Sequence, residues 1–378
     1  MERRPGPVAL VTWEDSARLY DFGPNHPLRP ERVLVTYENI KAASLLDLAH
    51  VREEPARTAI DSEIEAVHDP AFVDAVRGID TGSLDSWHGL EFGLGTSDDP
   101  IFDGMHSASA AVCGATLTAV EAVVSGGARH AFNPAGGLHH ARRREASGFC
   151  IYNDPAVGIA KALEMRPDWR VMYVDIDVHH GDGVQWIFYE EPRVLTVSLH
   201  QSGRYLYPGT GSERELGEGP AKGTAANVPL LPFTGNTDYL WAAEALIPAL
   251  AEAFRPHLLV TQLGADTHHG DPLANLGLTM AAYPCLARLL HDTAHSFAEG
   301  RWVATGGGGY QATTVVPKVW TIHFAEMCGA PDRVPPEWLD DRPPDEVSRE
   351  DRSEVERSVN EVLDTCLPVL SALARGGP

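Results

Sequence analysis

The sequence predicts an α/β fold built around a parallel β-sheet. Short apolar runs recur along the 378-residue chain. They are continuous rather than alternating, which is typical of strands covered on both faces. Longer segments with helical spacing separate them, and this alternation indicates βαβ units joined by right-handed crossovers. Hydrophobic residues make up 43% and charged residues 22% of the chain, so wholly disordered and fibrous classes are excluded.

The apolar runs give the expected strands. They cover residues 8–13, 171–178, 194–199, 258–263 and 302–305. Helices are expected between them. Pro30 opens one, because proline fits a first helical position and helical spacing follows it. Thr237 is a candidate cap for a helix that ends near Phe254. The other expected helices cover residues 107–125, 279–298 and 312–327.

The composition changes near the C-terminus. Residues 330–349 are rich in proline and charge, which indicates a surface excursion. Helical spacing returns over residues 350–373, where Pro368 should kink or end the helix. The sequence shows no repeat and no clear linker elsewhere, so it predicts one domain over residues 1–378.

Charge and cysteine usage limit the expected partners. Lys and Arg total 30 against 53 Asp and Glu, a net charge of −23. This charge repels a phosphate backbone, so no nucleic acid is expected, and it attracts cationic substrates. The apolar runs break after about ten residues, too short for a bilayer, so no membrane partner is expected. Five cysteines without a C-x-x-C pair, and a start without a secretory signal, favour the cytoplasm.

One expected strand runs directly into three carboxylates and two imidazoles. Strand alternation sends Asp175, Asp177 and His179 toward one side. The strand over 258–263 leads to Asp266 at the same edge, where parallel sheets bind ligands. Burying so many ionisable groups is costly unless they pair or hold a metal. Asp177, His179 and Asp266 therefore predict a three-ligand site with an open position, the pattern of a catalytic zinc.

Two further loops carry groups suited to acid–base chemistry. A Gly-Gly turn precedes His139 and His140, which could supply a general base and an electrostatic partner. Asp175 and Asp182 are available to orient the two imidazoles. Four glycines precede Tyr310 and allow the backbone to approach a ligand closely. The Tyr310 hydroxyl could then donate to a developing oxyanion.

Taken together, these blocks resemble the histone deacetylase family, and specifically its bacterial branch of acetoin utilisation proteins. The resemblance runs from His26 to Tyr310. It rests on Asp-Ile-Asp-Val-His-His-Gly-Asp-Gly, Gly-Ala-Asp and Gly-Gly-Gly-Gly-Tyr, in that order. The resemblance implies an arginase-like three-layer fold with one eight-stranded parallel sheet. It also implies zinc-dependent removal of acetyl or other short acyl groups from lysine side chains.

The resemblance assigns catalytic roles position by position. Zinc would be held by the three ligands named above. His140, oriented by Asp182, would be the general base and acid. His139, paired with Asp175, would act mainly through its charge. Tyr310 would polarise the scissile carbonyl.

The resemblance also implies substrate and potassium sites. The matching substrate-binding positions are Asp98 (with Asp99 as its rival), Gly148, Phe149, Tyr207, Leu273 and Gly308. Structural K⁺ beneath the zinc would be held, mostly through carbonyls, by Asp175, Asp177, His179, Ser198 and Leu199. Tyr207 stands where phenylalanine is common, so its hydroxyl leaves the acyl preference open. Leu273 stands where polyamine enzymes tend to carry an acid, which favours lysine substrates.

Three alternative functions stay open beside this one. An acetylpolyamine amidohydrolase would share the chemistry. A manganese ureohydrolase would need spare carboxylates for a second metal, such as Asp175, Asp182 and Asp271, but its matching strand end normally carries two closely spaced aspartates. A non-catalytic binding protein is disfavoured because His140, Tyr310 and the ligands are all present. The expected partner is an acyl-lysine protein or peptide, or a small acylated amine.

Overall fold

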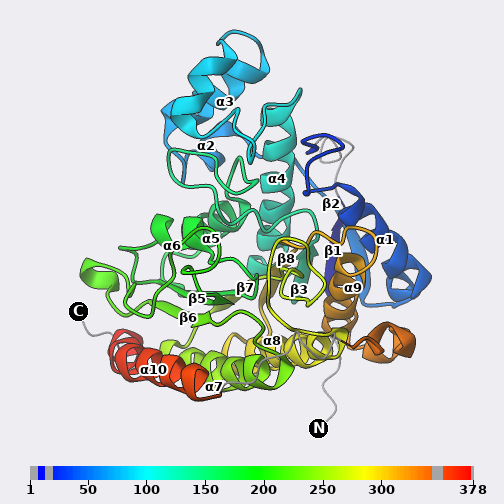
Figure 1. Ribbon diagram of the computed structural model, residues 1–378, viewed down its shortest axis with the longest axis vertical. Coiled ribbons are helices and arrows are strands. Elements are labelled where there is room, and N and C mark those ends of the chain that lie inside the picture. The colour runs from blue at the N-terminus through cyan, green and yellow to red at the C-terminus, as the bar shows by residue number, and fades with distance from the viewer. Residues whose placement is uncertain (1–6, 13–19, 343–351, 376–378) are drawn as a thin grey trace.

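The computed structural model, which describes residues 7–12, 20–342 and 352–375, is built on one eight-stranded sheet. All its strand pairs are parallel, in the order β2-β1-β3-β8-β7-β4-β5-β6 (Figure 1). The strands are β1 (Val8–Thr12), β2 (Val51–Pro55), β3 (His130–Asn133), β4 (Val171–Asp175), β5 (Val194–Gln201), β6 (Ala225–Leu230), β7 (Leu258–Gln262) and β8 (Trp302–Thr305). The predicted fold class is confirmed.

Helices cover both faces of the sheet (Figure 1). One layer holds α1 (Glu31–Ala42), α7 (Asn236–Phe254), α8 (Tyr283–Phe297), α9 (Val316–Met327) and α10 (Arg352–Ala374). The other holds α2 (Asp61–Ile64), α3 (Pro70–Asp80), α4 (Met105–Val124), α5 (Asp154–Met165) and α6 (Asp182–Ile187). The 3₁₀ helices are η2 (Leu45–Asp47), η3 (Ser86–Phe92), η4 (Gly219–Ala221), η5 (Met280–Ala282), η6 (Pro331–Arg333) and η7 (Pro336–Leu339).

The two layers explain why the strands are apolar without alternation. In β4, Met172 and Val174 pack into one core, whereas Val171 and Tyr173 pack into the core on the opposite face. Because side chains alternate between the faces of a strand, both sets must be apolar. Continuous apolar runs are therefore the sequence signature of this three-layer arrangement.

Several predicted boundaries were wrong. The edge strands β2 and β6 and the short central strand β3 were not predicted, and β4 ends at Asp175, earlier than expected. Thr237 lies inside α7, which begins after Gly235, so it is not the cap. α10 continues past Pro368 to Ala374. Its buried residues on both sides of the proline, Val362 and Leu370 among them, pack into the core and hold the helix together.

The prediction that apolar runs stop after about ten residues was also wrong for α4. This 20-residue helix contains an 18-residue stretch with a mean hydropathy of 1.5 and is long and apolar enough to cross a membrane. However, 78% of that stretch is buried inside the protein. Its small residues (such as Ala115) pack in the core between α3, α5 and the sheet, as expected for a central helix.

The segment after α9 contacts the body of the protein. Residues 330–342 form η6 and η7, and Trp338 and Leu339 pack against the core. Asp341 accepts hydrogen bonds from His268 at 2.7 Å and His269 at 3.2 Å. The rest of the predicted excursion, residues 343–349, lies outside the described residues, as do Trp13 and the first two residues of the 350–373 helix. One domain over residues 1–378 stays a prediction.

Candidate functional site

Four neighbouring strands deliver the predicted site loops to one edge of the sheet. Asn133 of β3 pairs with Thr305 of β8, Thr305 with Gln262 of β7, and Gln262 with Asp175 of β4. These four residues are the last residues of their strands and form one row across the sheet. The loops that follow them carry the four blocks of acids, imidazoles and tyrosine found in the sequence. The C-terminal edge of a parallel sheet thus gathers residues that are far apart in the chain.

The three predicted metal ligands converge in the interior. His179 Nδ1 lies 3.0 Å from Asp177 Oδ1 and 3.2 Å from Asp266 Oδ2. One donor atom from each residue lies within 4.8 Å of the others, and all three residues are buried. Donor atoms bound to one tetrahedral zinc are about 3.3 Å apart, so this spacing matches what one ion requires.

The local backbone leaves space for an ion and little else. A Cβ atom on Gly308 would lie 2.1 Å from Asp266 Oδ2 and 2.7 Å from Asp177 Oδ2. A Cβ atom on Gly264 would lie 2.3 Å from Asp177 Oδ2. Only glycine permits such close approach at these two positions. The two buried carboxylates outweigh the burial of His179 and raise its pKa to about 10, which shows that the cluster attracts positive charge. The residues present therefore fit a divalent cation.

Further hydrogen bonds fix the orientation of the two carboxylates. Asp177 Oδ2 accepts from Gln262 Nε2 at 2.6 Å and from the Gly308 amide at 2.7 Å. Asp266 Oδ1 accepts from the Val178 amide at 2.9 Å. Such outer contacts keep ligands in place before a metal arrives.

The histidine pair forms two Asp–His dyads. Asp175 Oδ2 accepts from His139 Nδ1 at 2.7 Å, and Asp182 Oδ1 accepts from His140 Nδ1 at 2.6 Å. The two Nε2 atoms are 3.0 Å apart. Asp182 also accepts from Arg142 Nη2 at 3.0 Å. The predicted pairing of each imidazole with its aspartate is thus present in the geometry.

The two imidazoles differ in charge. Burial opposes charge on His139, but Asp175 and Asp177 outweigh it and raise its pKa to about 9. Burial, followed by the charge of His139, lowers the pKa of His140 to about 4. His140 is therefore neutral at pH 7 and can accept a proton, whereas His139 supplies positive charge beside it.

The glycine-rich loop places Tyr310 beside these groups. Arg32 Nη1 donates to the carbonyl oxygens of Gly307 at 2.6 Å and Gly309 at 3.2 Å. Asp271 Oδ2 accepts from the Tyr310 amide at 2.8 Å. The Tyr310 ring packs edge-on against Phe149, with centroids 5.8 Å apart. The loop is thus clamped from two sides, which holds the tyrosine ring at the wall of the pocket.

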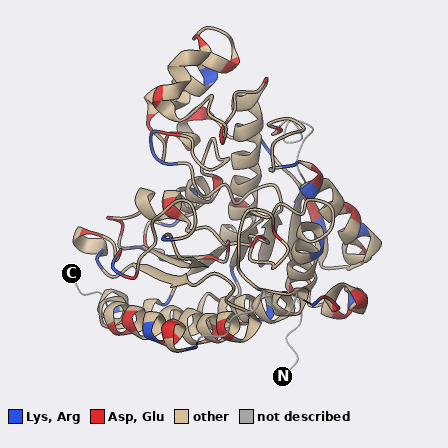
Figure 2. Cartoon of the chain, viewed as in Figure 1, with Lys and Arg blue, Asp and Glu red and all other residues tan. Residues whose placement is uncertain are grey.

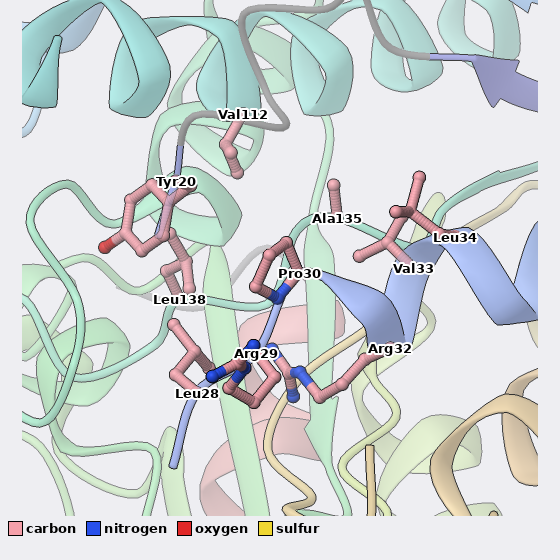
Figure 3. A pocket seen from close by; sticks show the side chains of 10 residues that line it. All are labelled: Tyr20, Leu28, Arg29, Pro30, Arg32, Val33, Leu34, Val112, Ala135 and Leu138. Atoms are coloured by element: carbon pink, nitrogen blue, oxygen red, sulfur yellow. The ribbon is translucent and has the colours of Figure 1, made fainter. Parts of the chain in front are cut away.

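A narrow pocket is lined by one predicted metal ligand, Asp177, by both dyad histidines and by Tyr310. It encloses about 270 Å³ of empty space, its open mouth included. Its lining residues are Leu28, Gly137, Leu138, His139, His140, Gly148, Phe149, Cys150, Asp177, Gly307, Gly308 and Tyr310. Gly148 is required because a Cβ there would lie 2.5 Å from the His140 ring. Leu28 and Leu138 also line a second pocket of about 460 Å³, which contains Arg32 and Tyr20 (Figure 3).

The predicted rim residues lie outside the pocket lining. Asp98 is exposed, whereas Asp99 is 2% exposed and its pKa is raised to about 8 by burial. Asp98 is therefore the better placed of the two to meet a substrate. The ring of Tyr207 packs edge-on against His140, with centroids 5.0 Å apart, and its hydroxyl bonds to Ser147. Leu273 is exposed.

The residues assigned to potassium come from β4, from the loop that follows it and from β5. Asp175 and Ser198 are register partners in β4 and β5, and Leu199 follows on β5. The Tyr239 hydroxyl lies 3.4 Å from the Leu199 carbonyl oxygen. With Asp177 and His179 in the adjoining loop, the predicted set is brought together, and its role stays a prediction.

Three contributing residues were missed from the sequence. They are Gln262, Arg32 and Arg142, which hold Asp177, the glycine-rich loop and Asp182, respectively. Gln262 could have been found, because a glutamine ends an otherwise apolar strand. Arg32 and Arg142 carry no such signal, since arginine at a helix start or in a loop is usually solvated.

Comparisons with known proteins agree with this geometry. The family model described as "Histone deacetylase domain" matches residues 26–327. "Acetoin utilization protein AcuC" of Bacillus subtilis (strain 168) is 42% identical over 333 residues, covering 88% of this chain and 85% of that protein. Proteins of the same name from Staphylococcus aureus (strain MRSA252) and Staphylococcus xylosus are 33% and 32% identical. The first alignment covers 90% of this chain and 87% of its relative, and the second covers 85% and 83%. The chain belongs to the histone deacetylase domain family.

Proposed function

We propose that the chain is a zinc-dependent amidohydrolase that removes acetyl or other short acyl groups from lysine side chains. The observation that carries this proposal is a buried cluster of three side chains that could hold a metal ion, beside a narrow pocket lined by Asp177, by the histidines of two Asp–His dyads and by Tyr310. Asp177, His179 and Asp266 would hold the ion. When bound, a divalent zinc polarises a carbonyl oxygen and lowers the pKa of bound water toward about 7.

The side chains of the pocket would transfer the proton and stabilise the charges that develop during the reaction. His140, neutral because its pKa is lowered to about 4, accepts a proton at Nε2 while Asp182 holds its Nδ1–H. The same nitrogen can return that proton to the leaving amine. His139 stays positively charged against Asp175 and stabilises negative charge that develops beside it. The Tyr310 hydroxyl donates to the oxyanion that forms from the amide carbonyl.

The pocket suits the methylene chain of an acylated lysine, and the charge of the protein suits a cationic molecule that carries this side chain. Leu28, Leu138 and Phe149 provide apolar walls for a row of methylene groups. The net charge of −23 attracts cationic partners, and acidic side chains are spread over the peripheral helices α3, α7 and α10 (Figure 2). Leu273 at the expected gatekeeper position favours a lysine side chain over a polyamine. We assign structural K⁺ to the Asp175 and Ser198 region beneath the pocket.

The carboxylates that a second catalytic metal would need are already engaged. Asp175 and Asp182 each accept from a histidine, and Asp271 accepts from the Leu273 and Tyr310 amides. This use of the spare acids favours a single ion over the two of a manganese ureohydrolase. A cytoplasmic location and the absence of nucleic-acid or membrane partners remain part of the proposal.

The test is hydrolysis of a panel of acyl-lysine peptides and acetylated polyamines by the wild type and Tyr310→Phe. We expect lysine deacylation that a chelator abolishes. Loss of one oxyanion donor should lower kcat roughly 10²–10³-fold with little change in KM. Hydrolysis of polyamines alone would overturn the lysine assignment. Near-wild-type kcat in Tyr310→Phe would overturn the role of the tyrosine.

A further inference from the structure

Three histidine side chains meet at the edge of the sheet opposite to the pocket. His130 is the first residue of β3, whereas the catalytic loops follow the last residues of the strands. His291 and His295 lie four residues apart on α8 and therefore share one face of that helix. One nitrogen from each of the three rings lies within 4.8 Å of the other two. We call this group the His130 cluster.

The spacing inside the cluster is that of metal ligands. His291 Nε2 and His295 Nε2 are 3.1 Å apart. Two nitrogen atoms bound to the same tetrahedral zinc are about 3.3 Å apart. Glu326 Oε1 of α9 accepts from His291 Nδ1 at 3.2 Å. A carboxylate in this position orients the ring and leaves its Nε2 lone pair for an ion.

His130 supplies an independent observation. Its side chain is 1% exposed, and its Nδ1 atom has no hydrogen-bond partner among the described residues. Its ring centroid lies 4.9 Å from that of His291 and 5.2 Å from that of His295. Burial, followed by the two neighbouring histidines and Arg129, lowers the pKa of His130 well below its usual value. A buried neutral imidazole with an unused nitrogen is what an ion would satisfy.

An ion can reach the cluster from solvent. His295 lines an open surface pocket of about 980 Å³ that also includes Arg129, Glu299 and Arg301. Arg301 is paired with Glu299 at 2.9 Å, which reduces the positive charge at this entrance. Glu326 supplies a negative charge beside the rings from the other side.

We propose that His130, His291 and His295 form a second metal site, separate from the catalytic one, with Glu326 orienting His291. Three imidazoles select Zn²⁺ or a similar divalent ion such as Ni²⁺ or Cu²⁺ over Mg²⁺ and Ca²⁺. Three protein ligands leave one coordination position open toward the surface pocket. The ion would link β3 to α8 directly and to α9 through Glu326. It would therefore cross-link the sheet to one helical layer.

The test is metal stoichiometry after equilibrium dialysis against Zn²⁺ alone, read by elemental analysis. We expect two ions per chain in the wild type and one in either His295→Ala or Asp266→Ala. The combined variant should bind none. His88→Ala removes a half-buried histidine on η3, outside both clusters, and should keep two. His295 is half-buried on a long helix, so its loss should leave the fold intact, and circular dichroism checks this.

A second readout does not depend on hydrolysis. Zn²⁺ should raise the thermal unfolding temperature of Asp266→Ala, and it should not do so when His295→Ala is added. Equal zinc binding by the wild type and His295→Ala would overturn the second site. One ion in the wild type that His295→Ala removes and Asp266→Ala keeps would support the His130 cluster and contradict the proposed catalytic centre instead.

Discussion

Replacing Gly308 with alanine tests the proposed catalytic metal site without changing any proposed ligand or any charge. The new Cβ atom would lie 2.1 Å from Asp266 Oδ2, whereas ordinary contact begins at 3.4 Å, so the atoms must separate by about 1.3 Å. Metal–ligand distances tolerate about 0.2 Å. We therefore expect zinc affinity to fall at least about 100-fold, the upper end of what disturbed outer contacts cost.

The assay is zinc competition against a coloured chelator, run in the His295→Ala background so that only one site is read. Gly127→Ala is the matched control, because its Cβ would meet no atom closer than 3.4 Å and its backbone is not left-handed. Thermal unfolding of the metal-free proteins separates loss of binding from loss of folding. A folded Gly308→Ala variant with zinc affinity within threefold of the control would refute the proposed position of the ion.

Four further predictions concern acid–base chemistry and buried histidines. Asp182→Asn removes the charge that orients His140, so steady-state kcat should fall roughly 10²–10⁴-fold with KM little changed; a kcat within threefold of wild type would contradict the dyad. His323 is fully buried, and neither ring nitrogen has a hydrogen-bond partner among the described residues, so His323→Leu should raise the free energy of unfolding by about 1–3 kcal/mol in urea titrations. The equally buried His68 bonds to the Arg142 carbonyl and the Asn153 amide, so His68→Leu should lower that free energy instead, and the same sign in both variants would be inconsistent with this account. Burial lowers the pKa of His68 to about 4, so the unfolded chain binds more protons between pH 6.5 and 4 and stability should fall as pH falls through that window. Protonation of His68 in the unfolded chain should lower the free energy of unfolding of the wild type by about 3 kcal/mol between pH 7 and pH 4. His68→Leu has no such loss, so the two proteins should converge in stability as the pH is lowered over this range.

Most of the fold could be predicted because the central strands are buried on both faces. Such strands must be apolar throughout, and their sequence shows it. The edge strands could not be predicted in the same way. β2 (Val51–Pro55) carries Arg and Glu residues on the solvent side, and β6 includes Asn227 and Pro229. Edge positions tolerate charge and proline, so these segments look like loops in the sequence.

The proposed ligands and dyads could be predicted because their chemistry is concentrated at strand ends. The residues that hold them in place could not. Arg32 bonds to Gly307, 275 positions away, and only the fold brings them together. Likewise, the choice between Asp98 and Asp99 depends on burial, which adjacent residues of the same type do not reveal. The prediction for Pro368 was wrong because proline on its own favours a break in a helix. In α10, buried residues before and after the proline pack into the core, and this packing keeps the helix continuous.

The most direct test of the central claim is zinc titration of chelator-treated protein while acyl-lysine hydrolysis is followed. The His295→Ala variant isolates the catalytic ion. The account predicts that activity returns in proportion to added zinc, reaches its plateau at one ion per chain, and never returns in the same protein carrying Asp266→Ala. Full activity of the metal-free protein, or zinc-restored activity in the Asp266→Ala protein, would contradict it.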